Sequence, residues 1–113
     1  SLLYTLYNSR ELYSVRITCY SGVMKRWTQI FKALGNVNRL KIIKLLSDKA
    51  PMTVTDISGE LEISFRATSQ HLIILHGLDI LTNEGKEGHV YYGYNRIMPS
   101  EIKKVVEIFL RTK

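Results

Sequence analysis

Cysteine is almost missing from this chain of 113 residues, in which Cys19 stands alone. A single cysteine excludes an internal disulfide framework and a zinc site built from thiolates, and it fits the reducing cytoplasm. Cys19 lies in a Tyr-rich stretch, where we interpret it as a small packed hydrophobic residue, with a redox switch as the alternative.

Long apolar runs are missing as well. No stretch approaches the roughly 18 uncharged apolar residues that favour a membrane-spanning helix. The first residues also lack the basic region, apolar run and small-residue cleavage site of a secretion signal. We therefore expect a cytoplasmic protein that does not associate with membranes.

Residue sets that support catalysis or metal binding are scarce. The sequence has no glycine-rich phosphate loop and no pattern that joins a nucleophile to a base and an acid, so we expect no enzyme. The histidines are His71 and His76, five residues apart and so not on one helix face, and His89. They do not supply the three or four converging ligands of a zinc-type site, so we expect no metal and no cofactor.

Basic residues, in contrast, are abundant. Sixteen Lys and Arg outnumber ten Asp and Glu, so the net charge is +6 and the isoelectric point is near 9.6. This balance favours an anionic partner. The length predicts one domain, residues 24–113, after an N-terminal extension of uncertain structure, residues 1–23. In that extension Leu12–Tyr20 alternates weakly like a strand, whereas apolar residues within 2–7 mark a helix face, and both readings stay open.

Helical patterns dominate residues 24–81. The first convincing helix opens at Met24 and ends before Gly35. The second begins at a capping residue, Asn36 or Asn38, and stops at Ala50-Pro51, because proline disfavours helix at the residue before it. A short third helix has its own capping residue. The candidates for that cap are Thr53 and Thr55.

A fourth helix follows after about three residues around Glu62–Ser64, with Ser64 as its cap. Its inward face is predicted to be Thr68, Leu72 and Leu75. Asp79 ends it in a left-handed turn. Two short helices with so short a link are typical of a helix-turn-helix.

A hairpin comes next, with strands at Ile80–Thr82 and His89–Tyr94 and a turn over Asn83–Gly88. A last helix starts at Pro99-Ser100. The predicted fold is mainly α with a small β-hairpin, a winged helix-turn-helix in which the hairpin is the wing.

Four segments of the chain follow one another in an order and at a spacing that are typical of one family. They are FKALGNVNRLKIIKLL (31–46), TVTDISGELEIS (53–64), ATSQHLIIL (67–75) and GHVYYGYN (88–95). On these segments the chain resembles the ArsR/SmtB-type winged helix-turn-helix transcriptional regulators over roughly residues 25–110. This resemblance implies a DNA-binding transcriptional regulator and, by analogy alone, a repressor.

Some positions depart from the family pattern. Thr53 and Thr55 occupy the positions of its metal-sensing Cys-x-Cys, and hydroxyls do not replace thiolates, so metal sensing is not expected. Asp79 replaces the usual Gly. Ile73 stands where members often carry Lys, so the fourth helix is less basic than in the family.

DNA contacts are expected from the polar front half of the fourth helix, because such helices enter the major groove with their N-terminal side chains. Arg66 can pair with guanine, Gln70 with adenine, and Ala67 can meet a thymine methyl. Wing residues would contact the backbone or minor groove. The full predicted set is Ser64, Arg66, Ala67, Ser69, Gln70, Lys86 and His89.

Apolar stripes on the first and last helices exceed what one small domain hides, which indicates a homodimer. A twofold dimer places its reading helices roughly 34 Å apart and predicts a palindromic operator in double-stranded DNA. The predicted interface comprises Trp27, Ile30, Phe31, Val105, Val106, Phe109 and Leu110.

Two further residues have structural interpretations. His71 is expected to be hydrogen-bonded and partly buried. Arg39 is expected first to hold a local partner, with a carboxylate suggested, because a cation at a helix start opposes the dipole. A contact with a DNA phosphate is the second interpretation of Arg39. The rival to the regulator is a winged-helix module that binds protein or RNA without reading DNA, which Ile73 and Ile74 motivate.

Overall fold

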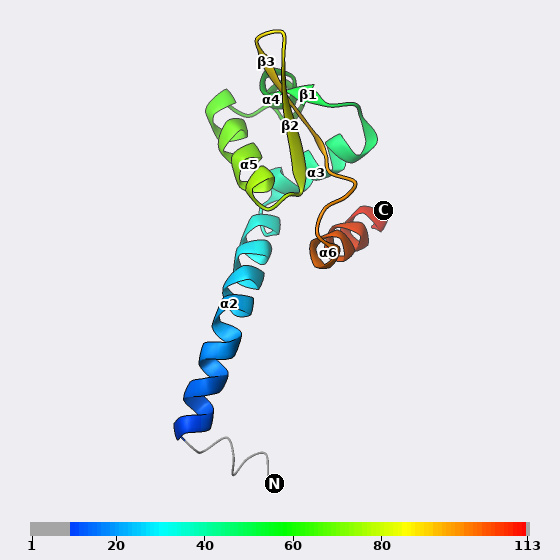
Figure 1. Cartoon of the computed structure of the whole chain (residues 1–113). Coiled ribbons are helices and arrows are strands. Elements are labelled where there is room, and N and C mark those ends of the chain that lie inside the picture. Colours follow the sequence, from blue (N-terminus) through cyan, green and yellow to red (C-terminus); the bar gives the residue numbers. More distant parts are fainter. Residues whose placement is uncertain (1–9, 113) are drawn as a thin grey trace. The chain divides into compact units, whose positions relative to one another are not determined.

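The computed structural model describes the backbone of residues 10–112 and the side chains of residues 22–112. Figure 1 shows the arrangement of the helices and strands. In chain order the elements are α2 (Arg10–Leu34), α3 (Val37–Asp48), β1 (Met52–Thr53), α4 (Val54–Leu61), α5 (Phe65–Gly77), β2 (Leu81–Lys86), β3 (His89–Tyr94) and α6 (Ser100–Arg111).

The chain divides into two units between Lys32 and Ala33. The first contains most of α2, and the second contains α3 to α6 with the sheet. None of the described helices is long and apolar enough to cross a membrane. The division of the sequence at residue 23 into an extension and a domain stays a prediction.

Helix α2 decides one open reading and corrects one expectation about the start of the chain. It begins at Arg10, so Leu12–Tyr20 is helical and not a strand, and Met24 does not open the helix. Tyr, Val and Thr disfavour a helix by only tenths of a kcal/mol each, and lengthening an existing helix needs no new nucleus. Gly22 is tolerated within it, with open space where a Cβ would lie. The apolar face within residues 2–7 lies outside the described residues.

In the second unit, side-chain caps begin the helices where the sequence predicted them. Asn36 Oδ1 accepts hydrogen bonds from the backbone N–H groups of Asn38 and Arg39, at 3.0 and 3.1 Å. Thr53 Oγ1 accepts from the N–H of Asp56 at 3.2 Å. Each cap pairs N–H groups that a helix start leaves without partners, so Asn36 and Thr53 set the first residues of α3 and α4.

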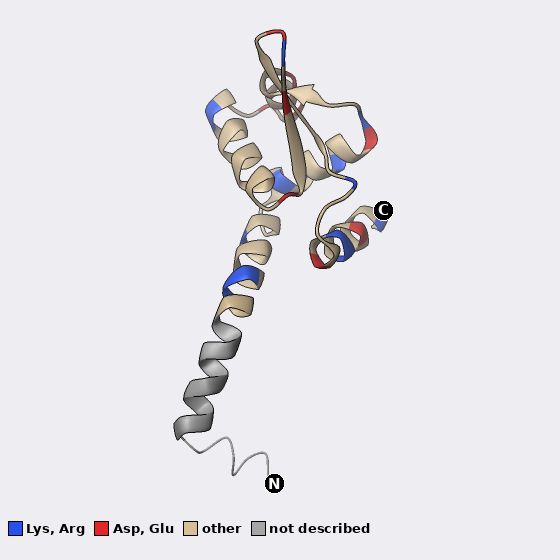
Figure 2. Cartoon of the chain, viewed as in Figure 1, with Lys and Arg blue, Asp and Glu red and all other residues tan. Residues whose placement is uncertain are grey.

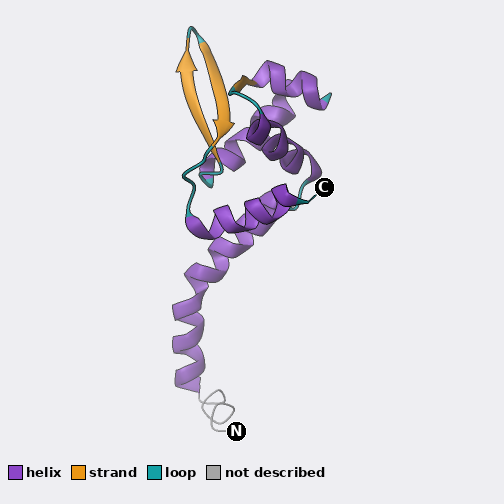
Figure 3. Cartoon of the chain, turned by 90° about the vertical axis from the view of Figure 1, so that its right-hand side faces the viewer, coloured by secondary structure: helices purple, strands orange, loops and turns teal. Residues whose placement is uncertain are grey.

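The sheet is antiparallel, with strand order β1-β3-β2. Its third strand, β1, was not predicted, because two residues show no periodicity. The predicted turn over Asn83–Gly88 is wrong: pairing continues from Leu81↔Tyr94 to Lys86↔His89. Only Glu87 and Gly88 turn, both with positive φ, at 53° and 80°. This geometry belongs to the tight hairpin turns that match strand twist, and Figure 3 shows the resulting hairpin.

Buried aliphatic side chains from α3, α4, α5, β2 and α6 form the core. The predicted inward face of α5 is confirmed, since Thr68, Leu72 and Leu75 are all fully buried. Thr68 satisfies its hydroxyl by donating to the carbonyl of Ser64 at 2.8 Å. Helix α6 contributes Ile102 and Val106. The core therefore fixes the back of α5 and leaves its front to solvent.

Candidate nucleic-acid interface

Helices α4 and α5 form the helix-turn-helix, joined by Glu62–Ser64. Glu62 adopts the left-handed conformation, with φ 56° and ψ 41°, and its N–H donates to the carbonyl of Ser58. The N–H of Ile63 donates to the same carbonyl at 3.3 Å. These contacts end α4 in one residue and let the chain turn directly into α5.

Ser64 begins α5. Its Oγ accepts from the N–H of Ala67 at 3.1 Å, and its carbonyl accepts from the N–H of Thr68 at 3.0 Å. Because Leu72 and Thr68 are fully buried in the core, they fix the direction in which the first turns of α5 project. A reading element needs this fixed direction, because base contacts depend on sub-ångström placement.

The structure leaves the predicted reading residues accessible. Ser64, Arg66 and Gln70 are exposed, whereas Ala67 and Ser69 are half-buried. Phe65, which sequence reasoning missed, is 58% exposed at the first position of α5. Its position in the sequence could have indicated this exposure. Phe65 directly follows the capping Ser64 and precedes Thr68, the first buried residue of α5.

In the wing, Lys86 and His89 are exposed and pair across the last rung of the hairpin. Figure 2 shows basic colour at the start of α5 and at the hairpin tip, with acidic colour also at the tip. Glu87 lies in the turn, and a second acid, Glu84, lies on β2 opposite Tyr91. In Figure 1 both segments lie toward the same end of the second unit. The wing is therefore of mixed charge, which limits its attraction for phosphates.

His71 and Arg39 tie α5 to α3, at the back of the predicted reading surface. The Arg39 guanidinium donates from Nη1 to His71 Nδ1 at 3.2 Å, and its Nε donates to the carbonyl of Ala33 at 2.6 Å. Burial, and then the charge of Arg39, lower the pKa of His71 below its ordinary value. The ring is thus held neutral, as an acceptor at Nδ1. His71 is hydrogen-bonded and half-buried, as predicted.

The predicted interface residues differ in exposure. Phe31 is 60% exposed and stacks on the half-buried Trp27, with ring centroids 5.5 Å apart. Ile30 and Val106 are fully buried in the single chain, so they offer no accessible surface to a partner. Val105, Phe109 and Leu110 are half-buried. The homodimer interface stays a prediction.

Exposed apolar side chains outside the predicted sets are also present. Ile97 is 90% exposed and Ile108 is 66% exposed. On α5, Ile73 is 61% exposed and Ile74 is 42% exposed. Among residues 22–112 no three His, Cys, Asp or Glu side chains gather as a metal ion would require.

The chain matches a family model described as "Bacterial regulatory protein, arsR family" over residues 36–83. It is 32% identical over 75 residues to the arsenical resistance operon repressor of Bacillus subtilis, covering 66% of this chain and 71% of that protein. It is 36% identical over 83 residues to the transcriptional activator HlyU of Vibrio cholerae, covering 73% and 72%.

Solved structures agree with this comparison. The structure of HlyU from Vibrio cholerae matches with a TM-score of 0.64 at 28% identity, covering 78% of this chain and 91% of that one. A homodimeric winged helix-turn-helix DNA-binding domain from Mycobacterium bovis matches with a TM-score of 0.66 at 18% identity, covering 79% of each chain. At that identity the second match concerns the fold alone, and it confirms the predicted winged helix-turn-helix.

Proposed function

The chain belongs to the arsR family of bacterial regulatory proteins, and from this membership we propose that it is a homodimeric repressor that reads its operator with the front of α5. It is a DNA-binding transcriptional regulator, of a family that is not enzymatic. Repression by occupying an operator, the palindromic form of that operator and a place of action in the cytoplasm are parts of the proposal.

The observation that carries the proposal is the exposed polar front of a helix whose back is fixed in the core. Arg66 and Gln70 are exposed on that front, and each can form a bidentate contact with one base. The start of α5 carries no acidic residue in its first turn, so nothing there repels phosphates. We assign base contacts to Ser64, Arg66, Ala67, Ser69 and Gln70, and backbone or minor-groove contacts to Lys86 and His89.

The homodimer is supported by two features. The Mycobacterium bovis domain of the same fold is homodimeric. The stacked Trp27 and Phe31 on α2, with Ile108 on α6, leave apolar surface exposed in the single chain. A twofold axis would repeat α5 about one DNA turn away, roughly 34 Å, and so call for two inverted half-sites.

Repression is favoured by similarity to the Bacillus subtilis repressor, although the Vibrio cholerae relative is an activator. A reporter gene placed behind the chain's own upstream DNA distinguishes the two. If the protein is a repressor, deleting the gene that encodes it should raise expression of the reporter. If it is an activator, the deletion should lower that expression.

DNA binding is tested by fluorescence anisotropy with the chain's own upstream DNA and with a scrambled duplex, over a series of salt concentrations. Specific reading predicts a much tighter complex with the upstream DNA. Lys86→Gln should weaken both complexes and reduce the salt slope by about one per subunit, because one phosphate contact is lost. The matched control is Lys41→Gln, which removes an exposed cation of α3 outside the proposed surface and should leave both complexes unchanged.

Equal, weak and salt-sensitive binding to both duplexes would contradict the proposal. It would favour the rival, a protein- or RNA-binding module, for which the exposed Ile73 and Ile74 are the supporting observation.

A further inference from the structure

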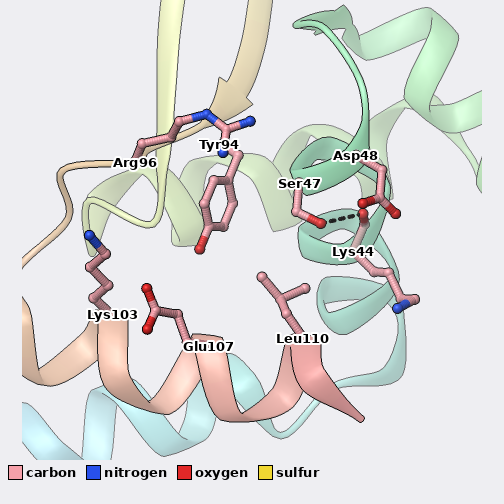
Figure 4. A pocket seen from close by; sticks show the side chains of 8 residues that line it. All are labelled: Lys44, Ser47, Asp48, Tyr94, Arg96, Lys103, Glu107 and Leu110. Atoms are coloured by element: carbon pink, nitrogen blue, oxygen red, sulfur yellow. Dashed lines mark hydrogen bonds between the residues drawn. The ribbon is translucent and has the colours of Figure 1, made fainter. Parts of the chain in front are cut away.

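A cavity of about 350 Å³ lies in the second unit, away from the front of α5. It is partly open to solvent and is lined by the C-terminal half of α3, the end of β3 with the segment after it, and one face of α6 (Figure 4). Its lining residues are Lys44, Ser47, Asp48, Tyr94, Arg96, Lys103, Glu107 and Leu110. The volume is in the range of small-molecule sites.

Two oppositely charged couples stand at this cavity on opposite helices, with the Lys44 ammonium directed away from it (Figure 4). Lys44 and Asp48 stand four residues apart on α3, and Lys103 and Glu107 stand four residues apart on α6. Oppositely charged residues at that spacing on a helix commonly pair. In the described part of the chain neither couple forms an ion pair, and Glu107 instead approaches Arg111 at 3.8 Å. Both signs of charge therefore line the cavity, although Glu107 also has this long contact with the exposed Arg111.

Tyr94 and Arg96 form the upper wall in Figure 4. The Arg96 guanidinium lies 5.8 Å from the centroid of the Tyr94 ring, and the Tyr94 hydroxyl points toward Glu107. Burial, and then the negative charge of Glu107, raise the pKa of Tyr94, while Arg96 opposes them. The phenol thus stays protonated and can donate a hydrogen bond. The ring and Leu110 provide the apolar surface.

We propose that this cavity binds a small zwitterion, a molecule with one carboxylate and one ammonium group on a short apolar linker. Arg96 and Lys103 bind the carboxylate, and Glu107 binds the ammonium. A dianion is disfavoured, because two of the five charged lining groups are acidic. A molecule with both charges can pair with the cationic and the anionic lining groups at once.

The second half of the inference rests on the proposed function: the ligand changes the affinity for DNA. Helix α3, which supplies one wall, packs against both α5 and β3. Helix α6, which supplies the other wall, carries predicted interface residues, including Leu110. A ligand that bridges α3 and α6 therefore acts on elements that support the reading helix, the wing and the interface. Coupling between two such sites is reciprocal.

Ligand binding is tested first without DNA, so that it does not depend on the proposed function. The full chain labelled with ¹⁵N is titrated with 4-aminobutanoate, up to about 20 mM, a range that detects millimolar dissociation constants. Butanoate and butylamine each keep one of its charges and are the matched ligands. We expect amide shifts at Tyr94, Arg96 and Lys103 with 4-aminobutanoate, and at least about tenfold weaker binding of either matched ligand.

Two variants separate the two charge sites. Arg96→Gln should weaken the binding of 4-aminobutanoate about tenfold and leave the affinity for butylamine unchanged. Glu107→Gln should weaken the binding of 4-aminobutanoate and leave the affinity for butanoate unchanged. Lys104→Gln, exposed on α6 and not lining the cavity, is the control and should bind like the unaltered chain. Absence of shifts, shifts elsewhere, or equal binding of butanoate and 4-aminobutanoate would overturn the site.

The coupling is tested by repeating the DNA anisotropy with saturating 4-aminobutanoate. We expect the dissociation constant for DNA to change by at least about fivefold in the unaltered chain and not in Arg96→Gln. Binding of the zwitterion without a change in DNA affinity would overturn the coupling and leave the site standing. Failure of DNA binding in every sample would instead contradict the proposed function.

Discussion

Ser64 caps helix α5 and is also a proposed DNA contact, and two substitutions can test these roles separately. Its Oγ caps α5 by accepting from the N–H of Ala67 at 3.1 Å, and its exposed side chain is a proposed DNA contact. Ser64→Ala removes the cap and adds no charge. Ser64→Asp keeps a capping oxygen and brings a negative charge to the front of α5.

The magnitudes follow from these contacts. Loss of a serine cap costs about 1 kcal/mol, because an exposed N–H must turn to water for a partner. The carbonyl of Ser64 keeps its bonds to Thr68, so the loss is confined to one N–H. Ser64→Asp should leave stability unchanged or slightly higher. On DNA, a unit charge roughly 8 Å from a phosphate costs about 2 kcal/mol near a protein surface, or roughly thirtyfold in affinity.

In thermal unfolding at fixed protein concentration, the melting temperature of Ser64→Ala should lie about 4–8 °C below that of the unaltered chain, for a domain of this size. Ser100→Ala is the control, since α6 begins with no side-chain cap hydrogen bond and Ser100 is exposed. Anisotropy should show Ser64→Asp binding DNA far more weakly than Ser64→Ala. Unchanged stability in Ser64→Ala would refute the cap, and unchanged DNA affinity in Ser64→Asp would refute the place of Ser64 at DNA.

Three further changes test the supporting structure. Leu72→Ala should lower the free energy of unfolding by about 2–5 kcal/mol in urea titrations, since Leu72 is fully buried; a loss below about 1 kcal/mol would contradict its core position. The folded pKa of His71 lies below 6.5, so the unfolded chain binds more protons between the two values, and stability should fall as pH drops through about 6.5. His71→Gln should remove this dependence, and an unaltered pH profile of stability would contradict it. Gly88→Ala should destabilise the hairpin by about 1–2 kcal/mol, because Gly88 has φ +80°, and equal melting temperatures would speak against that turn.

Local signals in the sequence predicted most of the second unit. Caps at Asn36, Thr53 and Ser64 and the inward face of α5 depend on residues within one or two turns of each other. The left-handed Asp79, with φ 60°, follows the same rule. Such features need no knowledge of distant partners, so periodicity and capping chemistry were sufficient.

Features set by distant partners were not predictable in the same way. Glu84 and Gly85 have weak strand preference, and their pairing with Tyr91 and Val90 on β3 makes them part of the hairpin. Strand β1 exists only through its pairing with β3, in which Met52 lies opposite Tyr92. The zwitterion cavity draws its lining from separate segments, so no single motif could indicate it.

The candidate site divides along the same line. The accessibility of Arg66 and Gln70 followed from their positions off the buried stripe of α5, which is Thr68, Leu72 and Leu75. Phe65 is exposed on α5, and Val106 is fully buried on α6. Each result depends on how that helix packs against its own neighbours, which helical periodicity describes only coarsely.

The central claim, that the front of α5 reads bases, is tested most directly with Arg66→Ala and a set of operators altered at single base pairs. The unaltered chain should lose about 1–3 kcal/mol of binding free energy when a recognised G·C pair is changed in a half-site. Arg66→Ala should bind the altered and unaltered operators equally at that pair while keeping discrimination elsewhere. Lys41→Ala removes one exposed cation of α3 and should keep the full profile. An Arg66→Ala profile that matches the unaltered chain at every position would contradict the account.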